Sequence, residues 1–393
     1  MLYFNPQLPM RPERIKQVVI STGLVIAMAV TGWLAFNKTK STSPLPPRNG
    51  ISASGLNPGS SNPIASSDTR LTFDGKLGEI AAGLVNANDK AGRSQMLARL
   101  RELLATGSTN EISQAIRGLL DSKIDAPTGE EFKISDHRFL SQAPTLRTLL
   151  LDYLGQIDPA AAAQCARLIL ADKNSPDEWA VALRDLALGD SSADGHLLLQ
   201  QKMAELLGYQ PWQQNPSVGY LEAFDVAVYL GGTSLVPALA DMVRQQDNPA
   251  LANAAYLALD RLIIADPAAL LAALLAQPSL MQGREQTRAD YFARADVRDS
   301  QQRSLVESYL LNPQMSGIEL QQFANVFPNG NFMVSNNLLT PKPLMDQPTL
   351  AARDAASLQA VQEWLADPRF ANIRPQLQTI ASRLAGFVQA GAH

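Results

Sequence analysis

Residues 229–262 read YLGGTSLVPALADMVRQQDNPALANAAYLALDRL, and their apolar spacing predicts two helices joined by a short polar turn. Residues 158–190 look like an earlier copy, because DPAAAAQCARLIL is followed there by SPDEWAVALRDLALGD. The paired prolines are 78 residues apart from Pro159 to Pro237 and 73 residues apart from Pro176 to Pro249. Both offsets are about twice a helix-pair unit of roughly 37 residues. The sequence therefore predicts pairs of α-helices that recur along the chain.

The stretch at 229–262 resembles the helical repeats of the HEAT and armadillo type. In those repeats a proline opens the first helix, a short polar turn follows, and Ala and Leu on the second helix pack inward. The resemblance extends over about residues 144–275. The chain departs from the family in having no fixed period and no repeated Arg or Lys on the second helix. The resemblance implies an irregular α-solenoid with a concave surface for a partner, and an irregular helical domain without regular curvature is the alternative.

Helical spacing continues over most of residues 71–393, which we expect to form one all-α, repeat-like domain. Ala and Leu dominate the apolar residues, and aromatic residues make up only 6% of the chain. Ser108 or Thr109 is expected to begin one helix, with Glu111 in its first turn. The compact start Ser175-Pro176-Asp177-Glu178 predicts a serine cap completed by a capping box.

The last helix is predicted from five large apolar residues spaced by four and three positions. They are Ile373, Leu377, Ile380, Leu384 and Phe387. We expect this face to cover the core of the domain. A coiled-coil contact with another chain is the alternative.

Residues 18–36, VVISTGLVIAMAVTGWLAF, contain neither charge nor proline. At 1.5 Å per residue such a helix spans about 28 Å, close to the ~30 Å hydrocarbon core of a bilayer. We therefore predict a single transmembrane anchor, preceded by a tail at 1–17. A cleavable signal peptide, cut after Ala27-Met28-Ala29, is the alternative. A short tail of this kind favours a body outside the cytoplasm, in a bacterial periplasm or cell envelope, although the flanking basic residues are nearly balanced.

Residues 37–70 are expected to be a disordered linker. In 41–70, 19 of the 30 residues are Ser, Pro, Gly or Asn, a composition that cannot bury enough apolar area to offset its chain entropy.

Charge argues against nucleic acid as a partner. Residues 1–70 hold seven of the 33 Lys and Arg and two of the 37 Asp and Glu, which leaves 26 basic and 35 acidic residues in the rest. An acidic body without a basic run repels phosphate backbones. The one cysteine, Cys165, lies in an apolar helical run and is expected to be buried.

No catalytic, cofactor-binding or metal-binding motif occurs in the sequence, and we expect no cofactor. Three histidines are present: His137, His196 and His393. The densest group of titratable residues is Glu130, Glu131, Asp136 and His137. We interpret it as a solvated loop leading into a helix, with divalent-ion binding as the alternative.

Two loops are candidates for recognition. GYQPWQQNPSVGY, 208–220, places Tyr209, Trp212 and Tyr220 among amides, a composition that suits a peptide or glycan surface. The alternative is that Trp212 fixes the loop between two helix pairs. FANVFPNGNFMVSNNLLTPKP, 323–343, contains Asn329 and Asn331, in either a type I′ hairpin turn or a packed irregular loop.

These features lead to two hypotheses for function. The first is a membrane-tethered helical scaffold or adaptor that binds a protein partner in the cell envelope, without catalysis of its own. The second is an envelope enzyme or glycan-binding module acting on cell-wall material. The sequence does not determine the oligomeric state.

Overall fold

The computed structural model describes residues 72–245, 247–331, 337–342 and 347–390. Most of these residues are helical, as the sequence predicts. The helices are α2 (Phe73–Val85), α3 (Lys90–Thr106), α4 (Thr109–Asp121), α5 (Leu146–Ile157), α6 (Pro159–Ile169), α7 (Pro176–Gly189), α8 (Ala193–Gly208), α9 (Gln210–Gln214), α10 (Val218–Glu222), α11 (Phe224–Leu230), α12 (Val236–Arg244), α13 (Pro249–Ala265), α14 (Pro267–Ala276), α15 (Glu285–Phe292), α16 (Ser300–Leu310), α17 (Gly317–Val326), α18 (Gln347–Ala366) and α19 (Arg374–Ala390). Two 3-10 helices are η2 (Pro278–Met281) and η3 (Pro368–Ile373).

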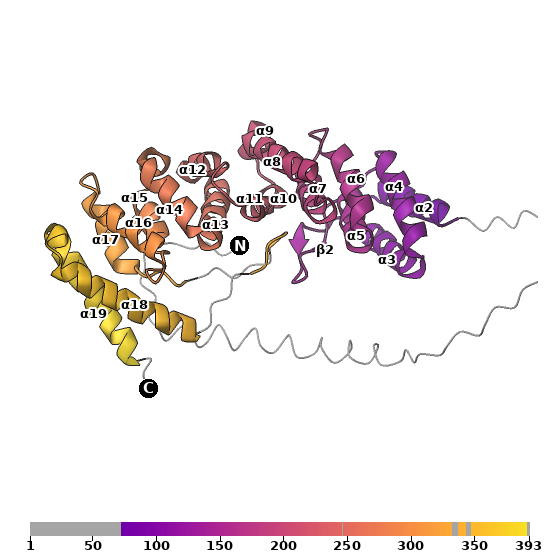
Figure 1. Ribbon diagram of the computed structural model, residues 1–393. Helices are drawn as coiled ribbons and strands as arrows, with labels where there is room; N and C mark the ends of the chain where they lie inside the picture. The colour runs from indigo at the N-terminus through magenta and orange to yellow at the C-terminus, as the bar shows by residue number, and fades with distance from the viewer. Residues whose placement is uncertain (1–71, 246, 332–336, 343–346, 391–393) are drawn as a thin grey trace, which may run out of the picture. The chain divides into compact units, whose positions relative to one another are not determined.

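The helices follow one another along the body in the order of the sequence (Figure 1). Most packing is therefore between neighbours, such as α2 with α3, α6 with α7, α12 with α13 and α18 with α19. A single cluster of buried apolar side chains continues from Leu77 to Leu384. Each helix thus buries its apolar face mainly against the helix before it and the helix after it.

The two copies seen in the sequence both form a pair of packed helices. In α6 and α7, and again in α12 and α13, a proline lies in the first turn of each helix. Proline suits this position because its missing N–H would have no partner there in any case. Asp158, Ser175 and Asn248 cap three of these helices with their side chains.

The predicted helix start at Ser108 is confirmed in full, and the one at Ser175 is confirmed in part. Ser108 and Glu111 form the full capping box at the start of α4. At α7 the Ser175 hydroxyl accepts from the Glu178 N–H at 3.3 Å, but the Glu178 carboxylate does not return to cap Ser175. It pairs instead with Arg147 at 2.6 Å. Because both of these side chains have little exposed surface, the ion pair replaces the second half of the predicted capping box.

A β-hairpin interrupts the helices where the sequence analysis expected a solvated loop. β1 (Lys133–Ile134) pairs antiparallel with β2 (Leu140–Gln142). Glu130 forms an ion pair with Arg101 at 2.8 Å, and Asp136 forms one with Lys342 at 3.2 Å. In the part of the chain that the structure describes, no group of three His, Cys, Asp or Glu is placed to hold a metal ion.

Arg184 on α7 connects this hairpin to the helices through hydrogen bonds and ion pairs. Its side chain is fully buried and pairs with Asp152 on α5 at 2.5 Å and with Asp185 at 2.7 Å. It also donates to the Arg138 carbonyl at 3.3 Å, and Asp152 accepts from the Leu140 N–H at 2.9 Å. Although burial lowers the pKa of Arg184, attraction to the two carboxylates raises it overall. The hairpin position therefore depends on a buried cation and its two acidic partners.

The C-terminal helix covers the core with fewer residues than expected. Leu377, Ile380 and Leu384 are buried, whereas 54% of the Phe387 surface is exposed. Ile373 ends η3 rather than belonging to α19, and it packs on the edge of the core. The predicted face of five residues is therefore a buried face of three.

The predicted anchor at 18–36 and linker at 37–70 lie outside the described residues. Among the helices that the structure describes, none combines the length and apolar character needed to cross a membrane. The buried environment expected for Cys165 is confirmed.

Replacing Arg184 by Met should destabilise the body by roughly 3–5 kcal/mol, because Asp152 and Asp185 would be left buried without a cation. The matched control is Lys123→Met, which removes an exposed pair with Asp172 at 3.4 Å and should cost at most about 1 kcal/mol. Urea unfolding followed by circular dichroism measures both variants. Equal effects of the two substitutions would contradict the central place given to Arg184.

Candidate functional site: a groove along helix α13

One face of α13 lines three hollows that follow one another along the helix. Their volumes are about 680 Å3, 290 Å3 and 230 Å3. Ala250 borders both the first and the middle hollow, and Ile264 borders both the middle and the third. We call the three hollows together the α13 groove.

Small side chains on α13 create this space. Ala250, Ala254 and Ala258 recur every four residues and so lie on one face of the helix. Leu251, Leu259 and Leu262 on other faces are buried in the core. Asn248 caps the helix start, and Pro249 occupies its first position. The pattern leaves a shallow channel along the alanine face.

A short segment from far along the chain forms one wall of the groove. Residues 337–342, which we call the strap, lie beside α11, as the separate orange segment in Figure 1 shows. Asp225 on α11 accepts from the Leu339 N–H at 2.6 Å and from the Thr340 N–H at 2.8 Å. Arg138 in the β-hairpin donates to the Leu339 carbonyl at 2.8 Å. The strap is thus held by its backbone, and its first residue, Asn337, borders the middle hollow.

The middle hollow contains a carboxyl group without a partner. Glu222, at the end of α10, is half-buried, and its carboxylate makes no hydrogen bond or ion pair with any described residue. Burial, with the nearby charge of Asp225, raises the pKa of Glu222 to about 7, although Arg261 opposes the shift. Near neutral pH the Glu222 carboxyl group is therefore only partly ionised, which is unusual for a glutamate.

The third hollow is basic. Arg353 on α18 is 4% exposed and donates to four backbone carbonyls, those of Asn329, Ala293, Arg294 and Ala295. Its Nε–H is buried without an acceptor. Arg294, which borders the same hollow, pairs with Asp260 at 2.8 Å. Burial lowers the pKa of Arg353, since no carboxylate lies within ion-pair distance of it among the described residues.

Amide side chains border the first hollow. Gln210 and Gln214 come from α9, and Gln245 and Asp247 come from the turn before α13. The Asn248 side chain donates to the Gln213 carbonyl at 2.6 Å and so ties that turn to α9. The first hollow therefore offers hydrogen-bonding groups on a fixed frame.

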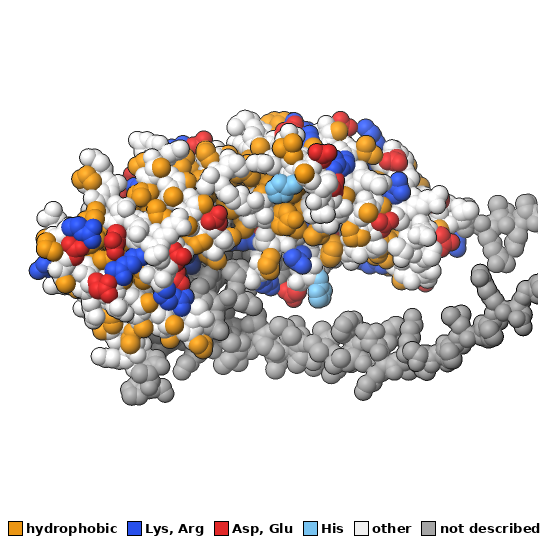
Figure 2. All heavy atoms as spheres, viewed as in Figure 1, with side chains coloured by type: hydrophobic (Ala, Val, Ile, Leu, Met, Phe, Trp, Pro, Cys, Tyr) orange, Lys and Arg blue, Asp and Glu red, His pale blue; other side chains and the backbone are white. Residues whose placement is uncertain are grey.

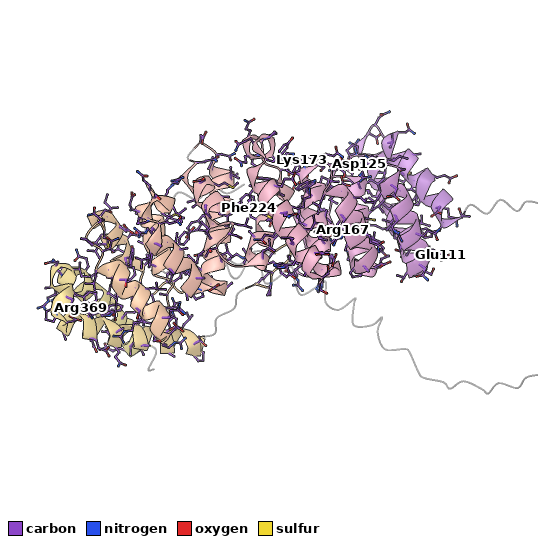
Figure 3. The ribbon with its side chains drawn as sticks, turned by 45° about the horizontal axis from the view of Figure 1, so that its top comes forward. Glu111, Asp125, Arg167, Lys173, Phe224 and Arg369 are labelled. Atoms are coloured by element: carbon purple, nitrogen blue, oxygen red, sulfur yellow. The ribbon has the colours of Figure 1, made fainter. Side chains whose placement is uncertain are left out.

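Of the predicted aromatic residues, Trp212 and Tyr220 are buried and Tyr209 is half-buried. Trp212 contacts Trp179, Tyr209 and Tyr220 edge to face, with ring centres 5.3, 4.9 and 6.3 Å apart. Trp212 is 8% exposed and Tyr220 is fully buried against Phe224. Phe224 is labelled in Figure 3, among the helices in the middle of the body. This packing agrees with the alternative in which Trp212 fixes the loop, while a binding role for Tyr209, Trp212 and Tyr220 stays a prediction.

Asn329 and Asn331 lie at the other end of the groove. The Asn329 N–H donates to the Ala293 carbonyl at 2.7 Å, and its side chain accepts from the Asn331 N–H at 3.1 Å. Neither Asn329 nor Gly330 is among the described residues with positive φ, which a type I′ turn requires at both positions. Of the two alternatives, Asn329 and Gly330 therefore lie in an irregular loop and not in a type I′ turn. A binding role for its asparagines also stays a prediction.

Charged side chains gather on one part of the visible surface. Figure 2 shows blue and red side chains gathered toward the end of the body that contains α17–α19. Ion pairs in the C-terminal part of the chain include Arg303 with Glu363 at 2.6 Å and Arg369 with Asp367 at 2.7 Å.

No protein-family model matches this chain, and neither a curated protein nor a solved structure shows significant similarity to it. The groove must therefore be interpreted from its own chemistry. Sequence reasoning missed Glu222 and Arg353, because no motif surrounds either residue and their environments form only when α10, α13 and α18 come together.

Replacing Glu222 by Gln should raise the melting temperature by a few degrees at pH 8.5 and leave it unchanged at pH 4. The folded-state pKa of about 7 lies above the ordinary value of 4.5, so folding favours the protonated form. That contribution is present below the ordinary pKa and is lost as the pH rises through 7.

Thermal melts by circular dichroism at both pH values test this expectation. The exposed Glu102 on α3 provides the control, and Glu102→Gln should show no such pH-dependent difference. A gain of the same size at pH 4 and pH 8.5 for Glu222→Gln would show that the carboxyl group is not destabilised by burial.

Proposed function

We propose that this protein is a membrane-tethered helical scaffold, without catalysis of its own, that binds a segment of a protein partner in the α13 groove. The observation that carries the proposal is the groove itself, lined by small side chains along one helix. A 17-residue helix is about 25 Å long. An extended segment of roughly seven or eight residues matches that length.

The division of the groove into three hollows supports a peptide rather than one small molecule. Small-molecule sites enclose most of their ligand in a single concave cavity. An extended chain instead places successive side chains in separate pockets, as peptide-recognition grooves require. The recurring helix pairs support the irregular α-solenoid as part of this proposal, because solenoids present grooves of this kind.

The tether is the second part of the proposal. It rests on the uncharged apolar run at 18–36 and the Ser, Pro, Gly and Asn-rich linker at 37–70. The body would lie on the outer side of the cytoplasmic membrane, in the cell envelope. The partner would then be an envelope protein within reach of the linker.

One observation favours a glycan-binding module as the second candidate. The amides of the first hollow, with Asp247, offer the donors and acceptors that sugar hydroxyls need. The enzyme form of this candidate has less support. Asp225 and Asp260 border the middle hollow together with Glu222. Asp225 forms an ion pair with Arg261, and Asp260 forms one with Arg294. The described residues of this hollow therefore do not offer the pair of free carboxylates that a glycosidase uses. Neither His137 nor His196 borders the groove.

Filling the groove tests the scaffold proposal. Ala254→Trp places an indole in the middle hollow and should abolish recovery of the partner after crosslinking in membranes. Ala98→Trp, at an exposed position of α3 away from the groove, should leave recovery unchanged. Quantitative mass spectrometry of material crosslinked to the full chain measures both variants. Stoichiometric partner recovery with Ala254→Trp would rule out the α13 groove as the binding site.

Removing residues 18–36 tests the tether. The shortened chain should move from the membrane pellet to the soluble fraction and keep the melting temperature of the parent. Immunoblots of fractionated cells and thermal melts provide the two readouts. A variant that stays in the pellet after carbonate extraction while remaining folded would contradict a tether at these residues.

A further inference from the structure

Buried carboxylates in this protein follow a consistent rule. Each fully buried aspartate or glutamate of the described residues lies in an ion pair with an arginine. The pairs are Asp152 and Asp185 with Arg184, Glu178 with Arg147, Asp225 with Arg261, Asp260 with Arg294, and Glu319 with Arg288. Such pairing is expected, because an isolated charge loses its hydration on burial.

Two charged residues of the α13 groove have no ion-pair partner among the described residues. Glu222 is half-buried with no cation in ion-pair distance, although Arg261 borders the same hollow, and Arg353 is buried with no carboxylate in ion-pair distance. Glu222 borders the middle hollow and Arg353 the third, so the two unmatched charges lie in succession along one channel. A bound segment of opposite charge pattern would supply both missing partners.

The other charged groups that border the two hollows do not neutralise Glu222 or Arg353. In the middle hollow Asp225 pairs with Arg261 and Asp260 pairs with Arg294, which leaves Glu222 as the uncompensated charge when it is ionised. In the third hollow Arg294 is thus compensated, which leaves Arg353 beside Asp296. Asp296 is itself paired with Arg298 at 2.6 Å, and Asp354 acts on Arg353 only from a longer distance. The groove therefore changes sign along its length.

We propose that the α13 groove binds an extended protein segment that places a lysine or arginine against Glu222 and an aspartate or glutamate against Arg353. The inference rests on the proposed scaffold function and specifies the chemistry of the partner. The apolar residues Leu221 and Leu257 border the middle hollow and would contact the methylene chain of the basic side chain.

The geometry also sets the spacing of the two charges in the partner. Leu257 borders the middle hollow, and Ile264, seven residues further along α13, borders both the middle and the third. That separation corresponds to about 10 Å of helix, or roughly three residues of an extended chain. The basic and acidic residues of the segment should therefore be two to four positions apart.

The binding should depend on pH through Glu222. The charged groups that face it are Asp225 on α11 and Asp260 and Arg261 on α13. From α7, Asp177 packs on the start of α10, where it accepts from Ser217 and Gly219. Because Glu222 loses its proton as the pH rises through about 7, the basic side chain should bind more tightly at pH 8 than at pH 6.

An array of immobilised twelve-residue peptides tests the proposal with the labelled full chain. Each peptide has a Ser and Gly background and carries one Lys and one Glu that are two, three, four or six positions apart, in either order. Further peptides carry two Glu at the same spacings, Lys alone, Glu alone or neither. We expect the strongest signal from one order and a spacing of two to four, about tenfold above the peptides with a single charge.

Two variants of the protein make the test specific. Glu222→Gln should remove the preference for Lys and its dependence on pH, while the preference for Glu remains. Glu222→Lys should reverse the preference at that position, so that peptides with two Glu bind best. The rescue by charge reversal separates a direct contact from general loss of structure, which thermal melts of each variant monitor.

The outcomes separate this inference from the proposal on which it rests. Binding of all charged peptides alike, or an unchanged preference in Glu222→Lys, would overturn the charge pattern even if Ala254→Trp still blocks partner recovery. Loss of partner recovery together with the expected peptide preference supports both. If Ala254→Trp has no effect on partner recovery, the scaffold proposal for this groove fails, and the inference fails with it. Binding of glycan but not peptide probes would also overturn it.

Discussion

The carboxylate of Asp225 joins parts of the chain that are more than a hundred residues apart. It accepts from the Leu339 and Thr340 backbone and also pairs with Arg261 on α13. Other contacts join the same segment to the middle of the body, because Arg138 donates to the Leu339 carbonyl, Arg261 donates to the Thr340 hydroxyl and Lys342 pairs with Asp136. Without this acceptor the strap would have two buried N–H groups to satisfy, and the α13 groove would lose one wall.

Arg184 holds the β-hairpin in position through hydrogen bonds, as Asp225 holds the strap. Each is a buried charged side chain on a helix that holds a non-helical segment by its backbone groups. The two segments also meet, because Arg138 of the hairpin donates to the Leu339 carbonyl of the strap. Apolar packing alone places helices against helices, whereas directional bonds to charged groups fix irregular segments at one position. The irregular segments are thus positioned by electrostatics and the helices by burial.

Helix starts and helix pairs were predictable because their causes are local. Ser108 with Glu111, Pro159 after Asp158 and Pro249 after Asn248 each satisfy or avoid backbone N–H groups within one turn. The prediction weakened where a side chain found a partner far along the chain. Glu178 pairs with Arg147 instead of completing its capping box, and residues 130–142 form a hairpin because Arg184 and Asp152 bind them. Phe387 is exposed although it continues the apolar spacing, because no described helix covers that end of α19.

The sequence by itself determined the helical class of the body, the helix pairs at 158–190 and 236–267, and the burial of Cys165. These follow from periodicity and capping, which act within a few residues. Only the tertiary structure decided which residues share the α13 groove. Glu222, Arg261, Asn337 and Arg353 come from four separate elements, and their pairing or lack of pairing depends on distances that no local pattern encodes. The tertiary structure also turned Trp212 and Tyr220 toward the core and Gln210 and Gln214 of the same loop toward solvent, because burial of the large rings stabilises the fold more than burial of these amides would.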